Sequence, residues 1–181
     1  PLVERIQAYA GSQLRFMEFC GGHTHAIMRY GIRSLVAPMV ELVSGPGCPV
    51  CVSANADLDR AIALSGVPGV ILATFGDMIR VPGSRESLQD AKARGADVRI
   101  VYSSLDAVQM ARENPQRPVV MLGVGFETTA PTIAASILHA EKQSIDNFYV
   151  LSLHKLPPPA TQPILDAGEV HLDRIIGPGH V

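Results

Sequence analysis

The chain alternates short apolar segments with segments of helical periodicity, and this alternation constrains the fold more than any other feature. Most of the apolar segments are continuous, without a polar residue at every second position. Continuous apolar strands are typical of parallel sheets that are buried on both faces. Strands separated by helices indicate an α/β fold of the Rossmann-like kind. The expected strands are residues 14–19, 39–43, 70–73, 98–102, 119–123 and 148–151.

A proline-containing break at residues 114–118 interrupts this alternation and is the predicted domain boundary. We therefore expect a first α/β domain at residues 1–115 and a second, incomplete α/β domain at residues 116–181. Ligands of open parallel sheets bind beyond the carboxyl ends of the strands. The unusual loops of this chain all follow expected strands, so they are predicted to meet at one edge. They are residues 20–25, 45–51, 74–83, 123–131 and 154–155.

Composition excludes several classes of protein. The formal net charge is -2 and there is no long basic run, which argues against a nucleic-acid partner. No apolar run reaches the roughly 18 residues expected of a membrane span. The first residues lack the features of a signal peptide. Three cysteines, two of them close together, do not form a secreted disulfide framework, so a cytoplasmic protein is expected.

All three cysteines lie in two of the loops that follow expected strands. Cys20 opens the motif Cys20-Gly-Gly-His-Thr-His25, and Cys48 and Cys51 close the motif Gly45-Pro-Gly-Cys-Pro-Val-Cys51. A cysteine between a strand and a helix lies where backbone N–H groups favour an anion, which lowers the pKa of a thiol. A single cysteine is most often a small buried apolar residue. Here the flanking Gly, Pro and His residues favour a chemical role instead.

The two cysteine motifs predict different chemistry. The spacing of Cys48 and Cys51 suits a reversible disulfide, and it also suits half of a zinc site. Cys20 with His23 and His25 offers a thiolate and imidazoles, which suit iron, copper or zinc. An imidazole can also act as a base toward the thiol. For a single histidine, a surface or helix-capping role is the commoner alternative.

Loops that follow later strands contain further candidates. Asp77 has either a functional role or a structural one, in which it forms an ion pair with Arg80 that stabilises the loop. Glu127, Thr128 and Thr129 can hydrogen-bond a ligand, but the threonines can equally cap the helix that follows. The Gly-x-Gly that begins at position 123 lacks the third glycine of a dinucleotide-binding loop, so it is a weak signal.

Several long motifs, in this order along the chain, resemble the HypD family of [NiFe]-hydrogenase maturation factors. The resemblance covers nearly the whole chain. It rests on the two cysteine motifs, Phe75-Gly-Asp-Met78, Gly125-Phe-Glu-Thr-Thr-Ala-Pro131 and Gly177-Pro-Gly-His-Val181. It implies a scaffold on which iron with two cyanides and one carbon monoxide is assembled. The partners it implies are a HypC-like chaperone and a HypE-like cyanide donor.

The resemblance also implies roles for individual residues. Cys20 binds the iron together with a chaperone cysteine, His23 takes part, and Cys48 and Cys51 relay electrons. The other candidates are Asp77 and Glu127 as catalytic residues, and Gly21, Gly22, Thr128 and Thr129 as cofactor-binding residues. Four cysteines in the C-terminal region of the family hold a [4Fe-4S] cluster, and these ligands are not in this chain of three cysteines. The chain thus corresponds to roughly the N-terminal half of the family.

We therefore expect a metallocentre assembly factor with redox-active thiols rather than an ordinary turnover enzyme. Two alternatives remain at the level of sequence. One is a thiol-disulfide oxidoreductase that acts on proteins, which would not need the Cys20, His23 and His25 cluster. The other is an α/β ligand-binding module in which the cysteines are structural, which unreactive, buried thiols would favour.

Overall fold

The computed structural model describes residues 2–9, 11–50 and 52–177. The chain forms two compact units: the first contains residues 1–48 and 156–181, and the second contains residues 49–155. Each unit is a parallel β-sheet with helices, so the α/β fold class predicted from the alternation is confirmed. Within the described residues, no helix has both the length and the apolar character needed to cross a membrane.

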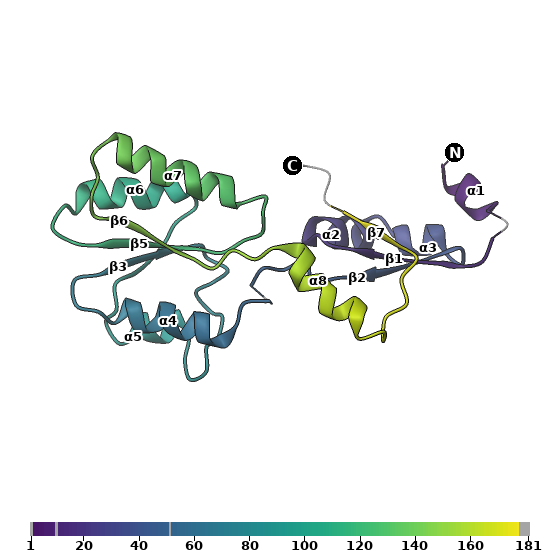
Figure 1. Ribbon diagram of the computed structural model, residues 1–181, viewed down its shortest axis with the longest axis horizontal. Coiled ribbons are helices and arrows are strands. Elements are labelled where there is room, and N and C mark those ends of the chain that lie inside the picture. The colour runs from purple at the N-terminus through teal and green to yellow at the C-terminus, as the bar shows by residue number, and fades with distance from the viewer. Residues whose placement is uncertain (1, 10, 51, 178–181) are drawn as a thin grey trace. The chain divides into compact units, whose positions relative to one another are not determined.

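The sheet of the second unit has four parallel strands in the order β4-β3-β5-β6. The strands are β3 (Ile71–Thr74), β4 (Val98–Ile100), β5 (Val119–Gly123) and β6 (Phe148–Ser152). Its helices are α4 (Asn55–Ser65), α5 (Leu88–Ala93), α6 (Ser104–Glu113) and α7 (Ala130–Lys142). Figure 1 shows α4 and α5 on one face of this sheet and α6 and α7 on the other.

Both faces of this sheet are buried, which explains the continuous apolar segments in the sequence. Leu72 and Leu122 pack into the apolar cluster on the side of α4 and α5. Ile71 and Met121 belong to the cluster on the side of α6 and α7. All four side chains have a relative exposure of 0%. Because neighbouring residues of a strand point to opposite faces, every position must be apolar when helices cover both faces.

The sheet of the first unit has three parallel strands in the order β2-β1-β7. The strands are β1 (Leu14–Glu18), β2 (Val40–Ser44) and β7 (Arg174–Ile176). Its helices are α1 (Leu2–Gln7), α2 (Gly21–Arg29), α3 (Ile32–Val36) and α8 (Pro157–Asp166). Glu18 pairs with Ser44, so β1 and β2 end level with each other. This register fixes where the loops that follow the two strands begin.

Two helices begin at glycine or proline residues. The Gly21-Gly22 pair opens α2, and Cys20 is the N-cap with an extended backbone (φ -134°, ψ 130°). Helix α8 starts at Pro157. A proline fits the first turn of a helix because the N–H it lacks would have no partner there.

The expected domain boundary between residues 115 and 116 does not separate the units. The segment 114–118 is a loop inside the second unit, and the strand that follows it, β5, pairs with β3. Asn147 holds this loop: its side-chain amide donates to the carbonyls of Ala111, Asn114 and Arg117 at 2.9, 2.9 and 2.8 Å. The chain instead leaves the first unit after Cys48 and returns to it at Leu156.

The expectation that all unusual loops share one sheet edge is wrong, because they belong to two sheets. Residues 20–25 and the start of 45–51 follow strands of the first unit. Residues 74–83, 123–131 and 154–155 follow strands of the second unit.

A cluster of charges joins the segments that lead into β4 and β5. Arg99 donates to both carboxylate oxygens of Asp97 at 2.8 Å, and Arg117 donates to Oδ2 at 2.8 Å. The hydrogen bonds from Arg99 are the main cause of a lowered pKa of Asp97, from 3.8 to about 2, with a further contribution from Arg117. The folded state therefore stabilises the ionised form of the Asp97 carboxyl group more than the unfolded state does.

Replacing Asp97 with Asn should remove a pH-dependent part of the stability. Because the folded pKa is depressed, the stabilisation is fully present above about pH 4 and is lost as the pH falls toward about 2. At pH 7 we expect Asp97→Asn to lower the free energy of unfolding by on the order of 1 kcal/mol, after allowance for solvent screening. Urea unfolding at several pH values measures this. A difference in the free energy of unfolding between the two proteins that stayed constant down to pH 2 would contradict this prediction.

Candidate functional site

The loops that contain Cys20 and Cys48 extend from adjacent parallel strands of the same sheet. Cys20 follows the end of β1 by two residues, and Cys48 follows the end of β2 by four. Because Glu18 and Ser44 are paired, both loops leave the sheet at its carboxyl edge. Both cysteines are half-buried, and Cys20 has a free thiol. Cys51 lies outside the described residues.

The backbones of these two loops are in direct contact. The N–H of Gly45 donates to the carbonyl oxygen of Glu18 at 2.7 Å. A Cβ atom on Gly47 would lie 2.4 Å from the carbonyl oxygen of Phe19 and 2.9 Å from the nitrogen of Cys20. No side chain fits at position 47 unless the backbone of one loop moves. The glycines of the Gly-Pro-Gly-Cys motif thus allow the Cys48 loop to pack against the Cys20 loop.

Glu18, at the end of β1, is a functional candidate that the sequence patterns did not identify. Its side chain is 2% exposed, and its Oε2 accepts the N–H of Cys20 at 3.0 Å. Its Oε1 accepts the hydroxyl of Thr24. Burial raises the pKa of this carboxyl group. Hydrogen bonds from Thr24, Ser44 and the Cys20 amide together lower the pKa by more than burial raises it, so the net shift is downward. A carboxylate in the mostly apolar segment that precedes Cys20 was the signal available in the sequence.

His23 and His25 differ in their surroundings on α2. His25 is exposed, whereas His23 is half-buried and its Nδ1 is buried with no hydrogen-bond partner in the described structure. This nitrogen is therefore shielded from solvent and unpaired within the described residues. Among the described residues, however, no three His, Cys, Asp or Glu side chains are grouped so that they could hold a metal ion by themselves. A metal bound by Cys20 and His23 would need further ligands from elsewhere.

Gly21 and Gly22 leave space beside the thiol of Cys20. A Cβ atom on Gly22 would lie 3.5 Å from the Cys20 sulfur, and one on Gly21 would meet nothing within 4 Å. A methyl group is therefore sterically tolerated at both positions. At Gly22 the missing side chain leaves open the space next to the Cys20 sulfur.

The remaining predicted residues lie in the second unit, in loops after β3 and β5. Asp77 follows β3, and the other three, Glu127, Thr128 and Thr129, follow β5. These strands are paired, so the loops share the carboxyl edge of that sheet. Asp77 and Glu127 are exposed. Thr129 is the N-cap of α7, as the capping alternative predicts, but its hydroxyl donates backward to the carbonyl of Phe126 at 3.1 Å.

His154 joins this edge from β6. Its Nδ1 lies 2.9 Å from the hydroxyl of Ser152, and its Nε2 is buried without a hydrogen-bond partner in the described part of the chain. Burial lowers the pKa of His154, which favours the neutral imidazole. A Cβ atom on Gly123 would lie 3.0 Å from this ring, and one on Gly125 would overlap the Thr129 side chain and lie 3.3 Å from the ring. The two glycines therefore leave room for the His154 ring and, at Gly125, for Thr129, which explains the segment without a dinucleotide.

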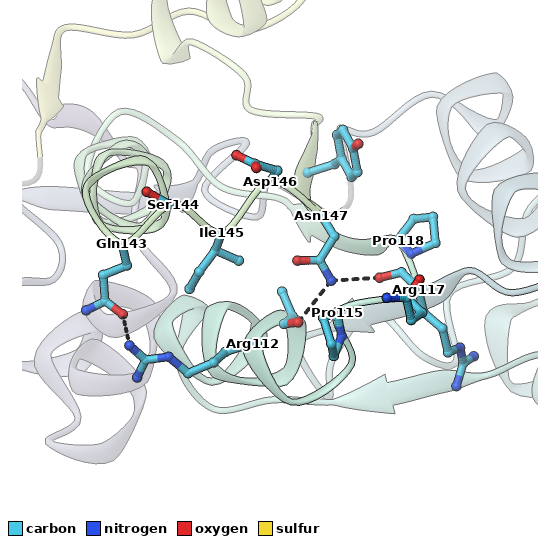
Figure 2. A pocket seen from close by; sticks show the side chains of 12 residues that line it. Arg112, Pro115, Arg117, Pro118, Gln143, Ser144, Ile145, Asp146 and Asn147 are labelled. Carbon is cyan, nitrogen blue, oxygen red and sulfur yellow. Dashed lines mark hydrogen bonds between the residues drawn. The ribbon is translucent and has the colours of Figure 1, made fainter.

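A pocket of about 530 Å³ lies at the opposite edge of the second sheet, before β5 and β6 (Figure 2). Figure 2 shows Arg112 bonded to Gln143, and Asn147 directed toward the 115–118 loop. These bonds connect the ends of α6 and α7 with the loops that enter the strands. The pocket contains none of the predicted site residues.

The sequence matches a known protein family over its whole length. A family model described as "HypD: Hydrogenase formation hypA family" matches residues 1–181. This chain belongs to the HypD family. The resemblance predicted from the motifs is thereby confirmed.

The HypD relatives include curated proteins from several bacteria. The chain is 50% identical to the hydrogenase maturation factor HypD of Rhodobacter capsulatus over 180 residues, which are 99% of this chain and 48% of the relative. It is 48% identical to HypD of Escherichia coli K12 over 168 residues, which are 93% and 45% of the two chains. For HypD of Azotobacter vinelandii the identity is 51% over 188 residues, with coverage of 99% and 50%. The chain thus spans about half the length of these relatives.

Adding a methyl group at Gly47 should separate the two loops and destabilise the first unit. The added Cβ of Gly47→Ala meets backbone atoms of Phe19 and Cys20, which cannot rotate away. We expect the free energy of unfolding to fall by about 1–3 kcal/mol, as for other overpacked sites. Urea unfolding measures this change.

Gly21→Ala is the matched control, because its Cβ would meet nothing within 4 Å and the residue lies in the first turn of α2. It should leave the free energy of unfolding unchanged or raise it slightly, since Ala favours a helix over Gly. Equal stability of the two variants would contradict the close packing of Gly47.

Proposed function

We propose that this HypD chain carries the iron-binding part of a scaffold for [NiFe]-hydrogenase maturation. Its cargo is an iron atom with two cyanide ligands and one carbon monoxide ligand. Membership of the HypD family supports a role in hydrogenase maturation. The observation that carries the proposal is the backbone contact between the Cys20 and Cys48 loops at one edge of the first sheet.

Cys20 is the proposed iron ligand of the chain. Its free, half-buried thiol belongs to the N-cap residue of α2. A thiolate is a soft ligand that suits low-spin ferrous iron with cyanide and carbonyl ligands. His23 contributes through its unpaired imidazole nitrogen. Two protein ligands leave positions for the diatomic ligands and for a cysteine of a HypC-like chaperone.

Cys48 and Cys51 are the proposed redox pair. Oxidation of two thiols to one disulfide releases two electrons and two protons, so a thiol pair beside the iron is a two-electron donor. The packing of Gly47 against Cys20 supports this role, because it keeps the loop of Cys48 beside the loop of the iron ligand. The four cysteines that hold a [4Fe-4S] cluster in the family are not in this chain, so no step here is assigned to a cluster.

The proposal extends to partners and to the second unit. A HypC-like chaperone and a HypE-like cyanide donor are the proposed partners, in the cytoplasm. Asp77 and Glu127 are proposed catalytic residues, and Gly21, Gly22, Thr128 and Thr129 are proposed to bind the cargo or its ligands. Support for the second-unit residues is that their loops share one carboxyl edge, where parallel sheets bind ligands.

Replacing Cys20 with Ser should abolish iron retention by the complete protein in complex with a HypC-like chaperone. The hydroxyl is a harder and far less acidic ligand than the thiol, so the iron loses its protein anchor. We expect loss of the iron measured by metal analysis and loss of the cyanide and carbonyl infrared bands of the anaerobic complex. The matched variant Cys48→Ser should retain iron but show weaker diatomic bands, because it lacks only the redox thiol.

A Cys20→Ser complex that kept its iron and both sets of infrared bands would contradict the proposal. Catalytic reduction of a generic disulfide by the iron-free protein would instead support a thiol-disulfide oxidoreductase.

A further inference from the structure

Glu18 is the one charged residue among the fully buried side chains of the described structure. Its relative exposure is 2%, although carboxylates are seldom buried unless other groups bind them. A buried charge without a partner destabilises the folded state. The groups that hydrogen-bond the carboxylate therefore show which part of the structure it stabilises. For Glu18 these groups belong to the two cysteine loops or to the strand that leads into one of them.

The carboxylate of Glu18 binds the first turn of α2 at two points. Its Oε2 accepts the N–H of Cys20 at 3.0 Å, and its Oε1 accepts the hydroxyl of Thr24. The Thr24 N–H in turn donates to the carbonyl oxygen of Cys20 at 2.9 Å. Hydrogen bonds thus fix both the N–H and the carbonyl group of Cys20, and the side chain of Cys20 takes no part in them. The carboxylate also lies at the N-terminal end of α2, where the helix dipole favours a negative charge.

The backbone of Glu18 binds the other cysteine loop. Its carbonyl oxygen accepts the N–H of Gly45 at 2.7 Å, and Gly45 opens the segment that leads to Cys48. The side chain and the main chain of one residue therefore hold the beginnings of both loops. The spacing between these loops depends on Glu18 as well as on the missing side chain of Gly47.

We infer that Glu18 is a positioning residue that fixes the backbone of Cys20 in the conformation in which its thiol binds iron. Each carboxylate oxygen already accepts a donor from the protein, so Glu18 supports the iron ligand and is not itself a ligand. This inference rests on the proposed function, because it takes Cys20 as the ligand. It goes beyond that function by identifying what orients the ligand.

Two substitutions of Glu18 separate positioning from charge. Glu18→Gln keeps a carbonyl oxygen for the Cys20 N–H, and its NH₂ group can donate to the Thr24 hydroxyl, which is both donor and acceptor. Glu18→Ala removes both contacts and the hydrogen bond from the Ser44 side chain. The matched control is Glu41→Gln, a carboxylate on the neighbouring strand β2 that is paired with Arg15 at 2.8 Å and is 41% exposed.

The first readout needs no iron and uses amide hydrogen exchange in the complete protein. In Glu18→Ala we expect the Cys20 amide to exchange at least about tenfold faster, because its acceptor is gone. The Gly45 amide is an internal control, since its acceptor is the main-chain carbonyl of Glu18, which the substitution keeps. Unchanged exchange at Cys20, or equal acceleration at Cys20 and Gly45, would overturn the inference.

The second readout is iron retained in the complex with a HypC-like chaperone, together with the infrared bands of the bound cyanide and carbonyl. We expect Glu18→Ala to lower retained iron about tenfold, while Glu18→Gln and Glu41→Gln stay within about twofold of the unsubstituted protein. Rescue by Gln separates positioning from a need for negative charge. Iron loss in Glu18→Gln equal to that in Glu18→Ala would overturn the inference, and so would full retention in Glu18→Ala.

The two readouts also separate failure of the inference from failure of the proposed function. If the unsubstituted complex retains no iron, the proposed function is wrong and, with it, the role of Glu18 in iron binding. If the unsubstituted complex retains iron and Glu18→Ala does so equally, the proposed function stands and the inference fails.

Discussion

The contact between two backbones, at Gly47 and Cys20, is the interaction on which the site of this HypD chain depends. Parallel pairing of β1 and β2 ends both strands at the same level, but pairing alone does not bring the following loops together. The absence of a side chain at Gly47 and the hydrogen bond from Gly45 to Glu18 do so. With the Cys20 amide held by a buried carboxylate, the fold itself fixes the backbone from which the thiol projects.

The alternation of apolar and helical segments was sufficient to predict the fold class and most of the strands. In the second unit, Leu72 and Ile71 show why, because adjacent residues pack on opposite faces and both must be apolar. The alternation could not predict how the strands divide between sheets. A proline-containing loop inside a unit resembles a linker in sequence, and only the pairing of β5 with β3 shows that the sheet continues across it. The three-residue strand β7 was too short to predict, since its exposed side chains give no buried pattern.

Site residues could be predicted where their type and spacing indicate the chemistry. They were harder to predict where their role depends on tertiary packing. Cysteine and histidine spacing identified Cys20 and His23, and order along the chain placed Cys48 close by. Glu18 was not identified, because the sequence does not show which groups hydrogen-bond a carboxylate at this position. The Thr24 hydroxyl reaches the carboxylate only in the folded chain. For His154, the Gly-x-Gly segment suggested a weak cofactor motif, whereas the structure shows glycines that leave room for its ring. Asp77 and Glu127 share an edge of the second sheet, but that edge belongs to a different unit from the one that contains Cys20.

The central claim is that the iron-binding thiol and the redox loop share one edge of the first unit. The most direct measurement is cross-linking of a Cys51→Ser protein with a short bifunctional thiol reagent, followed by peptide mapping. The account predicts a link between Cys20 and Cys48 within one molecule. If a monofunctional reagent modified both thiols while the bifunctional reagent joined them only between separate molecules, the two loops would not form one site and the account would be contradicted.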